Sequence, residues 1–447
     1  MSDRSIAPWL VDSRWPTVQI RLVARLGSGH TPSRSKPEYW ENCTVPWVTL
    51  SDVWQFRSGE QQYVSDTKEK ISQLGLNNSA ATLHAPGTVI LSRTASVGFS
   101  AIMASEMATS QDFATWTCGP RIEPRFLLHV LRGMAPDLKR ISMGSTHKTI
   151  YMPDIEQLRT PIPPLDEQRR IADFLDAEVS RIDRLVAART HQICLLQEHA
   201  KALVSEALLP GILSAPEGVW PWRWLPALPS DRPLVRLGYV CRIQNGLTID
   251  SRRDTSGNSI TLPYLRVANV QAGYVSLENV TEVTVPREMA ARAMLRPGDV
   301  LMTEGGDLDK LGRGTVWRGE LPECLHQNHV FALRPDASRL DGEYLALMTQ
   351  TVHGRCYFES TGVKTTNLAS TNSGKILSFP ILLPKVEVQR TVVAEVQRAQ
   401  AGLNRANAVL EKQLSLLSER RRALITAAVT GQLDISTASG RNITQGV

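Results

Sequence analysis

Residues 165–209 read LDEQRRIADFLDAEVSRIDRLVAARTHQICLLQEHAKALVSEALL, and the chain contains a second stretch of the same kind. No proline or glycine interrupts this stretch, so nothing in it breaks a helix. Adding 221 to each residue number carries Gln168 onto Gln389 and Leu196 onto Leu417. The register holds across roughly forty residues, which corresponds to a helix of about 65 Å. We therefore predict two equivalent long helices.

Apolar residues recur along both helices with the 3-4 spacing of a coiled coil. Each helix has two columns of heptad positions that face its partner. In the second helix one of these columns carries Gln400, Asn407 and Arg421, polar residues that weaken packing but can fix the register. Two unrelated amphipathic helices are the alternative, but a repeat without gaps indicates a shared structural demand. The predicted helix–helix interface is Leu175, Ile182, Leu196, Leu203, Val396, Leu403, Leu410, Leu417 and Leu424.

The composition is that of a globular protein of about three domains, given 447 residues with 42% hydrophobic content. No segment approaches the ~18 apolar residues of a membrane span, and the N-terminus lacks the pattern of a signal peptide. The six cysteines form no CxxC pair, so neither a disulfide framework nor a zinc ribbon is indicated. We expect a cytoplasmic protein whose net charge of +6 permits a polyanionic partner.

The region between the helices repeats the order of the region before the first helix. Pro263-Tyr264-Leu265 parallels Pro46-Trp47-Val48, and Pro297-Gly298 parallels Pro86-Gly87. The spacing between these copies varies, so strands recur while loops differ in length. We predict an α+β protein with two similar mixed α/β domains joined by two long antiparallel coiled-coil helices with pseudo-twofold symmetry. The predicted segments are domain one (1–162), helix one (163–210), a Pro/Trp-rich linker (211–234), domain two (235–383), helix two (384–432) and a disordered tail (433–447).

Catalytic motifs are missing from the sequence. It contains no GxxxxGK[ST] phosphate loop, no GxSxG nucleophile elbow and no HExxH metal helix. Cys324, His326 and His329 are candidate metal ligands, but no fourth ligand stands at a usual spacing. Asp112 and Glu304 are candidate paired acids, although nothing in the sequence places them together. We therefore predict a binding protein with no catalytic residue and no metal site.

Polar loops in both domains offer varied hydrogen-bonding groups. Arginine suits guanine edges, Asn and Gln suit adenine, and Lys, Ser and Thr suit phosphates. We predict DNA contacts by side chains of both domains. In the first domain these are Ser28, His30, Thr31, Arg34, Lys36, Arg93, Ser96, Gln111, Ser145, His147 and Lys148. In the second they are Gln244, Asn245, Arg252, Arg253, Lys310, Arg313, Asn328, His329, Lys364, Thr365 and Thr366.

These features together resemble the specificity subunit of a type I restriction–modification system. The loop Gly29-His30-Thr31-Pro32-Ser33, followed by Pro46-Trp47-Val48, resembles the opening of that family's target recognition domain. The run Ile162-Pro163-Pro164-Leu165-Asp166-Glu167-Gln168 resembles its entry into the spacer helix. The second copy departs from this pattern, because Val388 replaces the glutamate and one more residue separates the proline from Gln389.

The resemblance implies a division of labour. Each recognition domain reads one half of a bipartite site on double-stranded DNA, and the helices set the gap at roughly one duplex turn. Two modification subunits dock on the helices, bind S-adenosylmethionine and flip out the target adenine. Restriction subunits join with ATP and Mg²⁺, so no cofactor is bound by this chain. Two alternatives stay open: a self-contained DNA-modifying enzyme, and a structural tether that binds proteins.

Overall fold

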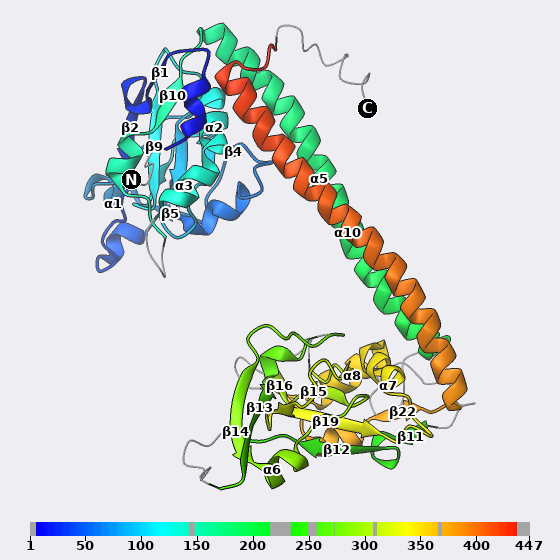
Figure 1. The fold of residues 1–447 in the computed structure, drawn as a ribbon. Coiled ribbons are helices and arrows are strands. Elements are labelled where there is room, and N and C mark those ends of the chain that lie inside the picture. The colour runs from blue at the N-terminus through cyan, green and yellow to red at the C-terminus, as the bar shows by residue number, and fades with distance from the viewer. Residues whose placement is uncertain are drawn as a thin grey trace. The chain divides into compact units, whose positions relative to one another are not determined.

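The computed structural model describes residues 6–142, 148–214, 234–248, 257–271, 273–306, 311–364 and 369–435. The chain divides into two compact units, residues 1–190 with 411–447 and residues 191–410. Two long helices, α5 (Leu165–Leu208) and α10 (Val386–Thr430), contribute to both units (Figure 1). Most of the predicted linker and tail lies outside the described residues.

The first unit is a mixed domain whose main sheet has five strands. Its strands are β1 (Thr17–Gln19), β2 (Ala24–Ser28), β3 (Val45–Val48), β4 (Tyr63–Val64), β5 (Glu69–Ile71), β6 (Val89–Ser92), β7 (Ser100–Met103), β8 (Ala108–Thr109), β9 (Phe113–Cys118) and β10 (Arg159–Pro161). Its helices are α1 (Gln73–Asn77), α2 (Pro124–Gly133), α3 (Ala135–Ile141) and α4 (Met152–Glu156), with 3-10 helices at Pro8–Asp12, Ile20–Leu22, Pro37–Trp40 and Leu50–Gln55.

The main sheet has the order β2-β9-β6-β7-β4, and a smaller sheet has the order β5-β3-β8. Strands β6 and β7 are fully buried, and their apolar and small residues are typical of strands covered on both faces. Helix α2 packs against both of them (Figure 1). The core of this domain extends onto Leu175 of α5 and Ile425 of α10. The first domain is therefore built onto the beginning of α5 and the end of α10.

The second unit repeats this plan. Its strands are β11 (Leu234–Arg236), β12 (Cys241–Asn245), β13 (Ser259–Leu265), β14 (Thr281–Pro286), β15 (Val300–Thr303), β16 (Gly305–Gly306), β17 (Thr315–Val316), β18 (Leu325–His326), β19 (Val330–Pro335), β20 (Val363–Lys364), β21 (Ala369–Ser370) and β22 (Pro380–Leu382). Its helices are α6 (Arg287–Arg292), α7 (Gly342–Gln350), α8 (Val352–Thr361) and α9 (Ser373–Leu377), with 3-10 helices at Leu237–Tyr239 and Val267–Asn269.

The strand order β12-β19-β15-β17 matches β2-β9-β6-β7 of the first unit. The parallel pairing of β3 with β8 recurs as the pairing of β13 with β18. In this unit the core takes in Val204 at the end of α5 and Val396 near the start of α10. The predicted fold class, two similar mixed domains joined by long helices, is confirmed.

The predicted interface residues of the helices are all buried or half-buried. In the first unit Arg421, predicted to help fix the register, forms an ion pair with Asp183 of α5, with 3.0 Å between Nε and Oδ1. Gly59, in the loop before β4, packs so closely on the Arg421 guanidinium that a Cβ there would lie 2.4 Å from Nη2. A shift of 221 places Ala200 and Asn404 at the equivalent positions of the second unit, so this ion pair has no counterpart there.

Candidate nucleic-acid interface

In each main sheet, a glycine follows the first strand and shapes the side of the sheet on which neighbouring strands end. A Cβ on Gly29, just after β2, would lie 2.0 Å from the carbonyl oxygen of Thr109. A Cβ on Gly246, just after β12, would lie 2.2 Å from the carbonyl oxygen of His326. Only glycine permits such a close approach of two backbones. The N–H of His30 donates to the Thr109 carbonyl at 3.0 Å, and the N–H of Leu247 donates to the His326 carbonyl at 2.8 Å.

The adjacent strands end in the same way in both domains. The N–H of Arg93, after β6, donates to the carbonyl of Asp112, before β9, at 2.8 Å. The N–H of Glu304, after β15, donates to the carbonyl of His329, before β19, also at 2.8 Å. The two domains thus share one backbone frame at this edge, which we call the tip. The side chains on the frame differ at nearly every position.

In the first domain several predicted DNA-binding residues meet at the tip. Thr31 Oγ1 lies 2.5 Å from Gln111 Oε1, and Arg93 Nε donates to the Gln111 carbonyl at 3.0 Å. Ser28 Oγ donates to the Phe113 carbonyl at 3.3 Å. The Lys148 carbonyl accepts the N–H of Ala95 at 2.8 Å, which brings Lys148, a residue distant in the sequence, to the same end of the sheet. His30 is exposed beside them.

Three other predicted residues of the first domain already have partners within the domain. Arg34 pairs with Glu69 at 2.9 Å and stacks over Trp40, whose ring centroid is 4.3 Å from its guanidinium carbon. Lys36 donates to the Tyr39 hydroxyl at 3.1 Å. Ser96 Oγ accepts a 3.3 Å hydrogen bond from Arg57. These contacts place Arg34 and Lys36 near the smaller sheet and Ser96 in the loop between β6 and β7.

In the second domain the tip carries Gln244, Asn245, Asn328 and His329. Gln244 Nε2 lies 3.5 Å from His326 Nε2, and Asn245 is exposed at the end of β12. The N–H of Asn328 donates to the Leu247 carbonyl at 3.0 Å. Half-buried Arg313 lies just before β17. The remaining predictions, Ser145, His147, Arg252, Arg253, Lys310, Thr365, Thr366 and the side chain of Lys364, lie outside the described residues.

Glu304 is a tip residue that the DNA-binding prediction left out. Its Oε2 lies 2.5 Å from His329 Nδ1. Glu304 and Asp112, considered as paired acids, belong to different units and each take part in the tip hydrogen bond of their own unit. The sequence does contain a signal for Glu304. A short buried strand ends just before Arg93 in the first domain and just before Glu304 in the second, which makes the two residues equivalent.

The Cys324, His326 and His329 group is dispersed by the fold. Cys324 is buried and His326 Nδ1 is bonded to the Val330 carbonyl at 2.7 Å, while His329 is exposed on the tip. Burial lowers the pKa of His326, which favours the neutral imidazole. Within the described part of the chain, no three His, Cys, Asp or Glu side chains are grouped to hold a metal ion.

A glutamine fastens each domain to its long helix. Gln168 is fully buried; its Oε1 accepts the N–H of Glu123 at 2.8 Å, and its Nε2 donates to the carbonyls of Arg121 and Pro163. Gln389 does the same in the second unit, accepting from Asp341 and donating to Arg339 and Pro384. Both reach a proline five residues earlier. The interpretation that one more residue separates the proline from Gln389 in the second copy is therefore wrong. Pro384 corresponds to Pro163 of the first copy, and the spacing to the glutamine is the same.

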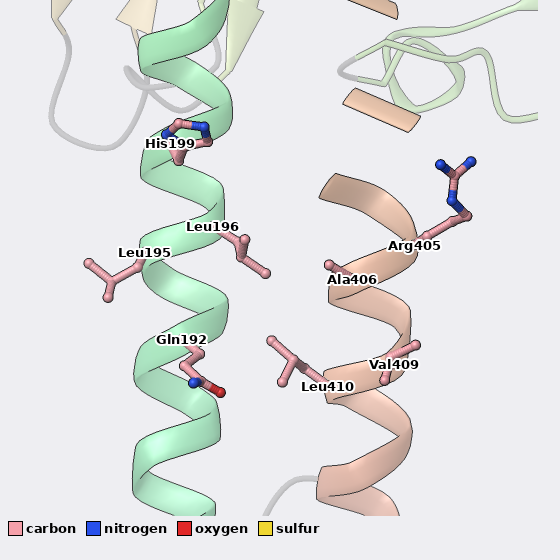
Figure 2. Close-up of a pocket in the computed structure, with 8 residues that line it drawn as sticks. All are labelled: Gln192, Leu195, Leu196, His199, Arg405, Ala406, Val409 and Leu410. Carbon is pink, nitrogen blue, oxygen red and sulfur yellow. The ribbon is translucent and has the colours of Figure 1, made fainter. Parts of the chain in front are cut away.

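The long helices leave an apolar groove in each unit. In the second unit the groove has a volume of about 680 Å³ and is lined by Gln192, Leu195, Leu196, His199, Arg405, Ala406, Val409 and Leu410. Figure 2 shows Leu196 and Leu410 directed toward one another between the helices. In the first unit the lining is Leu185, Arg189, Gln413, Leu416, Leu417 and Arg420. Every one of these six positions is a position of the other groove shifted by 221.

The fold and the tip define a protein with two similar domains, each presenting different polar side chains on one backbone frame. Residues 12–193 match the family model of the type I restriction modification DNA specificity domain. The EcoKI specificity subunit of Escherichia coli is 26% identical over 305 residues, which are 66% of this chain and 62% of that protein. The MjaIX specificity subunit of Methanocaldococcus jannaschii is 24% identical over 262 residues, which are 58% and 59%. The matches span about three fifths of these relatives' length.

Solved structures show the same fold. A chain from a type I R-M system has a TM-score of 0.69 and 21% identity, with 94% of this chain and 98% of that chain covered. The HsdS subunit from Thermoanaerobacter tengcongensis has a TM-score of 0.50 and 20% identity, with 96% and 98% covered. Residues 12–193 are thus similar to a type I DNA specificity domain, and the predicted resemblance of the chain to type I specificity subunits is confirmed. No helix in the described residues is long and apolar enough to cross a membrane.

Proposed function

We propose that this chain is the DNA specificity subunit of a type I restriction–modification complex and that each domain reads one half of a bipartite site. The observation that carries the proposal is the shared tip. Gly29 and Gly246 shape the same backbone frame, yet the side chains around them differ. A common frame with different hydrogen-bonding groups suits two readers that approach DNA alike and select different bases.

The long helices have two roles in the proposed function, as a spacer and as a docking surface. As continuous helices they space the two domains, and the fully buried Gln168 and Gln389 fasten the domains to them. The equivalent grooves favour two copies of one partner, because matched surfaces bind matched subunits. The groove leucines Leu195 and Leu416 are 49% and 54% exposed, which leaves apolar area for a partner helix to cover. We assign this partner to the modification subunit.

The chemistry then belongs to the partners. Modification subunits would bring S-adenosylmethionine, and restriction subunits would bring ATP and Mg²⁺. This chain contributes sequence choice and scaffold, acting on double-stranded DNA in the cytoplasm. The first alternative, a self-contained modifying enzyme, predicts S-adenosylmethionine binding by the purified chain alone. The second alternative, a protein tether, predicts no DNA sequence preference even with the modification subunits present.

The deciding experiment is to co-express the chain with its cognate modification subunit and to map adenine methylation across a genome. We expect one bipartite site. Exchanging residues 1–162 for the first domain of another specificity subunit should change one half of that site and leave the other half intact. A change in both halves would contradict independent reading by the domains.

The spacing role has its own test. Inserting seven residues after Glu198 and seven after Glu419 adds about two helical turns to each helix and preserves the heptad register. The methylated site should then tolerate a longer gap between the same two half-sites. An unchanged gap, with assembly intact, would refute the proposal that the helices act as a ruler.

A further inference from the structure

Glu304 is held firmly at the tip of the second domain. Its N–H donates to the His329 carbonyl and its carbonyl accepts the N–H of Thr371, both at 2.8 Å. Its carboxylate contacts the His329 imidazole, with 2.5 Å between Oε2 and Nδ1. The Glu304 and His329 side chains are 35% and 53% exposed. The pair is therefore oriented by the fold and open to solvent.

The same two positions in the first domain carry a basic and an acidic side chain in the reverse order. Arg93 stands where Glu304 stands, and Asp112 stands where His329 stands, on the same backbone hydrogen bond. Arg93 is used inside its domain, because its guanidinium donates to the carbonyls of Gln111 and Ile150. The carboxylate of the second domain thus has no acidic counterpart at the equivalent position, which sets the two tips apart.

The strand that follows Glu304 carries no side chains. Two glycines follow Glu304, and a Cβ added to Gly306 would meet no atom of the described residues within 4 Å. Gly306 has a φ of 156°, a conformation that side-chain-bearing residues rarely adopt. A strand with no side chains next to an exposed acid leaves room for a base pair to approach the carboxylate closely.

A carboxylate on a DNA-binding surface is unfavourable unless it meets a hydrogen-bond donor, because the phosphates repel it. The donors in the major groove are the exocyclic amines, N4 of cytosine and N6 of adenine. Adenine presents its N7 acceptor beside N6, and that lone pair would face a second carboxylate oxygen. Cytosine presents no acceptor there, so its N4 amine is the better match for Glu304.

We propose that Glu304 is a specificity-determining residue that accepts a hydrogen bond from cytosine N4, and that His329 is the positioning residue that orients its carboxylate. This inference rests on the proposed function. It assigns Glu304 as the reading residue, cytosine N4 as the DNA atom that it contacts, and cytosine as the preferred base. Because the second domain alone carries the acid at this position, the preference concerns only the half-site read by that domain.

The test uses the full chain co-expressed with its cognate modification subunit, with methylated sites mapped as above. In the Glu304→Gln variant an amide replaces the carboxylate, and an amide pairs with adenine N6 and N7. One G·C position in a single half-site should lose its preference by roughly 10-fold or more, with adenine gaining there. His329→Asn should relax the same position, and Glu288→Gln, an exposed glutamate of α6, should change nothing.

The possible results distinguish a failure of the proposed function from a failure of the base preference of Glu304. Wild-type methylation without any bipartite site would overturn the proposed function and this inference with it. A bipartite site that Glu304→Gln leaves unchanged would overturn the inference alone. A uniform fall in methylation at an unaltered site, in the Glu304→Gln and His329→Asn variants alike, would show that the Glu304–His329 contact is only structural and would also overturn the inference.

Discussion

Replacing Gln168 by alanine should loosen the first domain from α5 without affecting the second domain. The fully buried side chain makes three hydrogen bonds, at 2.8 Å to the Glu123 N–H, 3.0 Å to the Arg121 carbonyl and 2.9 Å to the Pro163 carbonyl. At about 1 kcal/mol for each bond, the loss is roughly 3 kcal/mol. That free energy corresponds to about a 100-fold rise in the population of the locally opened state.

Amide hydrogen exchange measures this opening directly, because the N–H of Glu123 is itself a partner of Gln168. In the Gln168→Ala variant the Glu123 amide should exchange about 100-fold faster, while the Asp341 amide keeps its wild-type rate. Gln389→Ala should give the converse result, since Gln389 accepts the Asp341 N–H at 2.8 Å. The control is Gln197→Ala, a change at an exposed glutamine of α5.

Equal exchange of the Glu123 amide in the Gln168→Ala and Gln197→Ala variants would refute the fastening role. So would equal acceleration at both domains, since the two sets of hydrogen bonds lie in separate units. The same variants connect stability with function. A loosened first domain should weaken methylation through its own half-site contacts and leave the preference at the other half unchanged.

Other parts of the structure give three more predictions. Gly246→Ala places a Cβ 2.2 Å from the His326 carbonyl, so the second domain should melt earlier by calorimetry and its half-site should lose selectivity; an unchanged transition would show that the backbones separate freely. Leu195→Asp and Leu416→Asp should each weaken binding of one modification subunit at least ~10-fold, and the double variant should bind neither, by analytical ultracentrifugation; full assembly of the double variant would exclude the grooves as docking sites. Burial lowers the pKa of His353, so the unfolded state takes up a proton that the folded state does not. Stability of the second domain should therefore fall as the pH drops below about 6.5, and His353→Gln should reduce this slope in thermal denaturation; an equal slope would assign the acid sensitivity to other groups.

Features that depend on local spacing could be predicted from the amino-acid order alone. Apolar residues at 3-4 intervals specify a helix with one apolar face, and an uninterrupted repeat specifies that this happens twice. The helices α5 and α10 follow from this pattern, as do buried interface positions such as Ile182 and Val396. The recurrence of short buried strands after Pro86-Gly87 and Pro297-Gly298 also follows, because turn and strand signals are local.

Which distant residues meet became known only from the folded chain. Glu304 and His329 are 25 residues apart, and Arg421 and Asp183 come from different helices, so no periodicity relates either pair. In the sequence Gln168 is one more polar residue of a helix, yet folding buries it and satisfies its amide with backbone groups of another segment. Such contacts depend on chain reversals and strand register, which arise from the packing of the whole domain, and spacing along the sequence does not encode them.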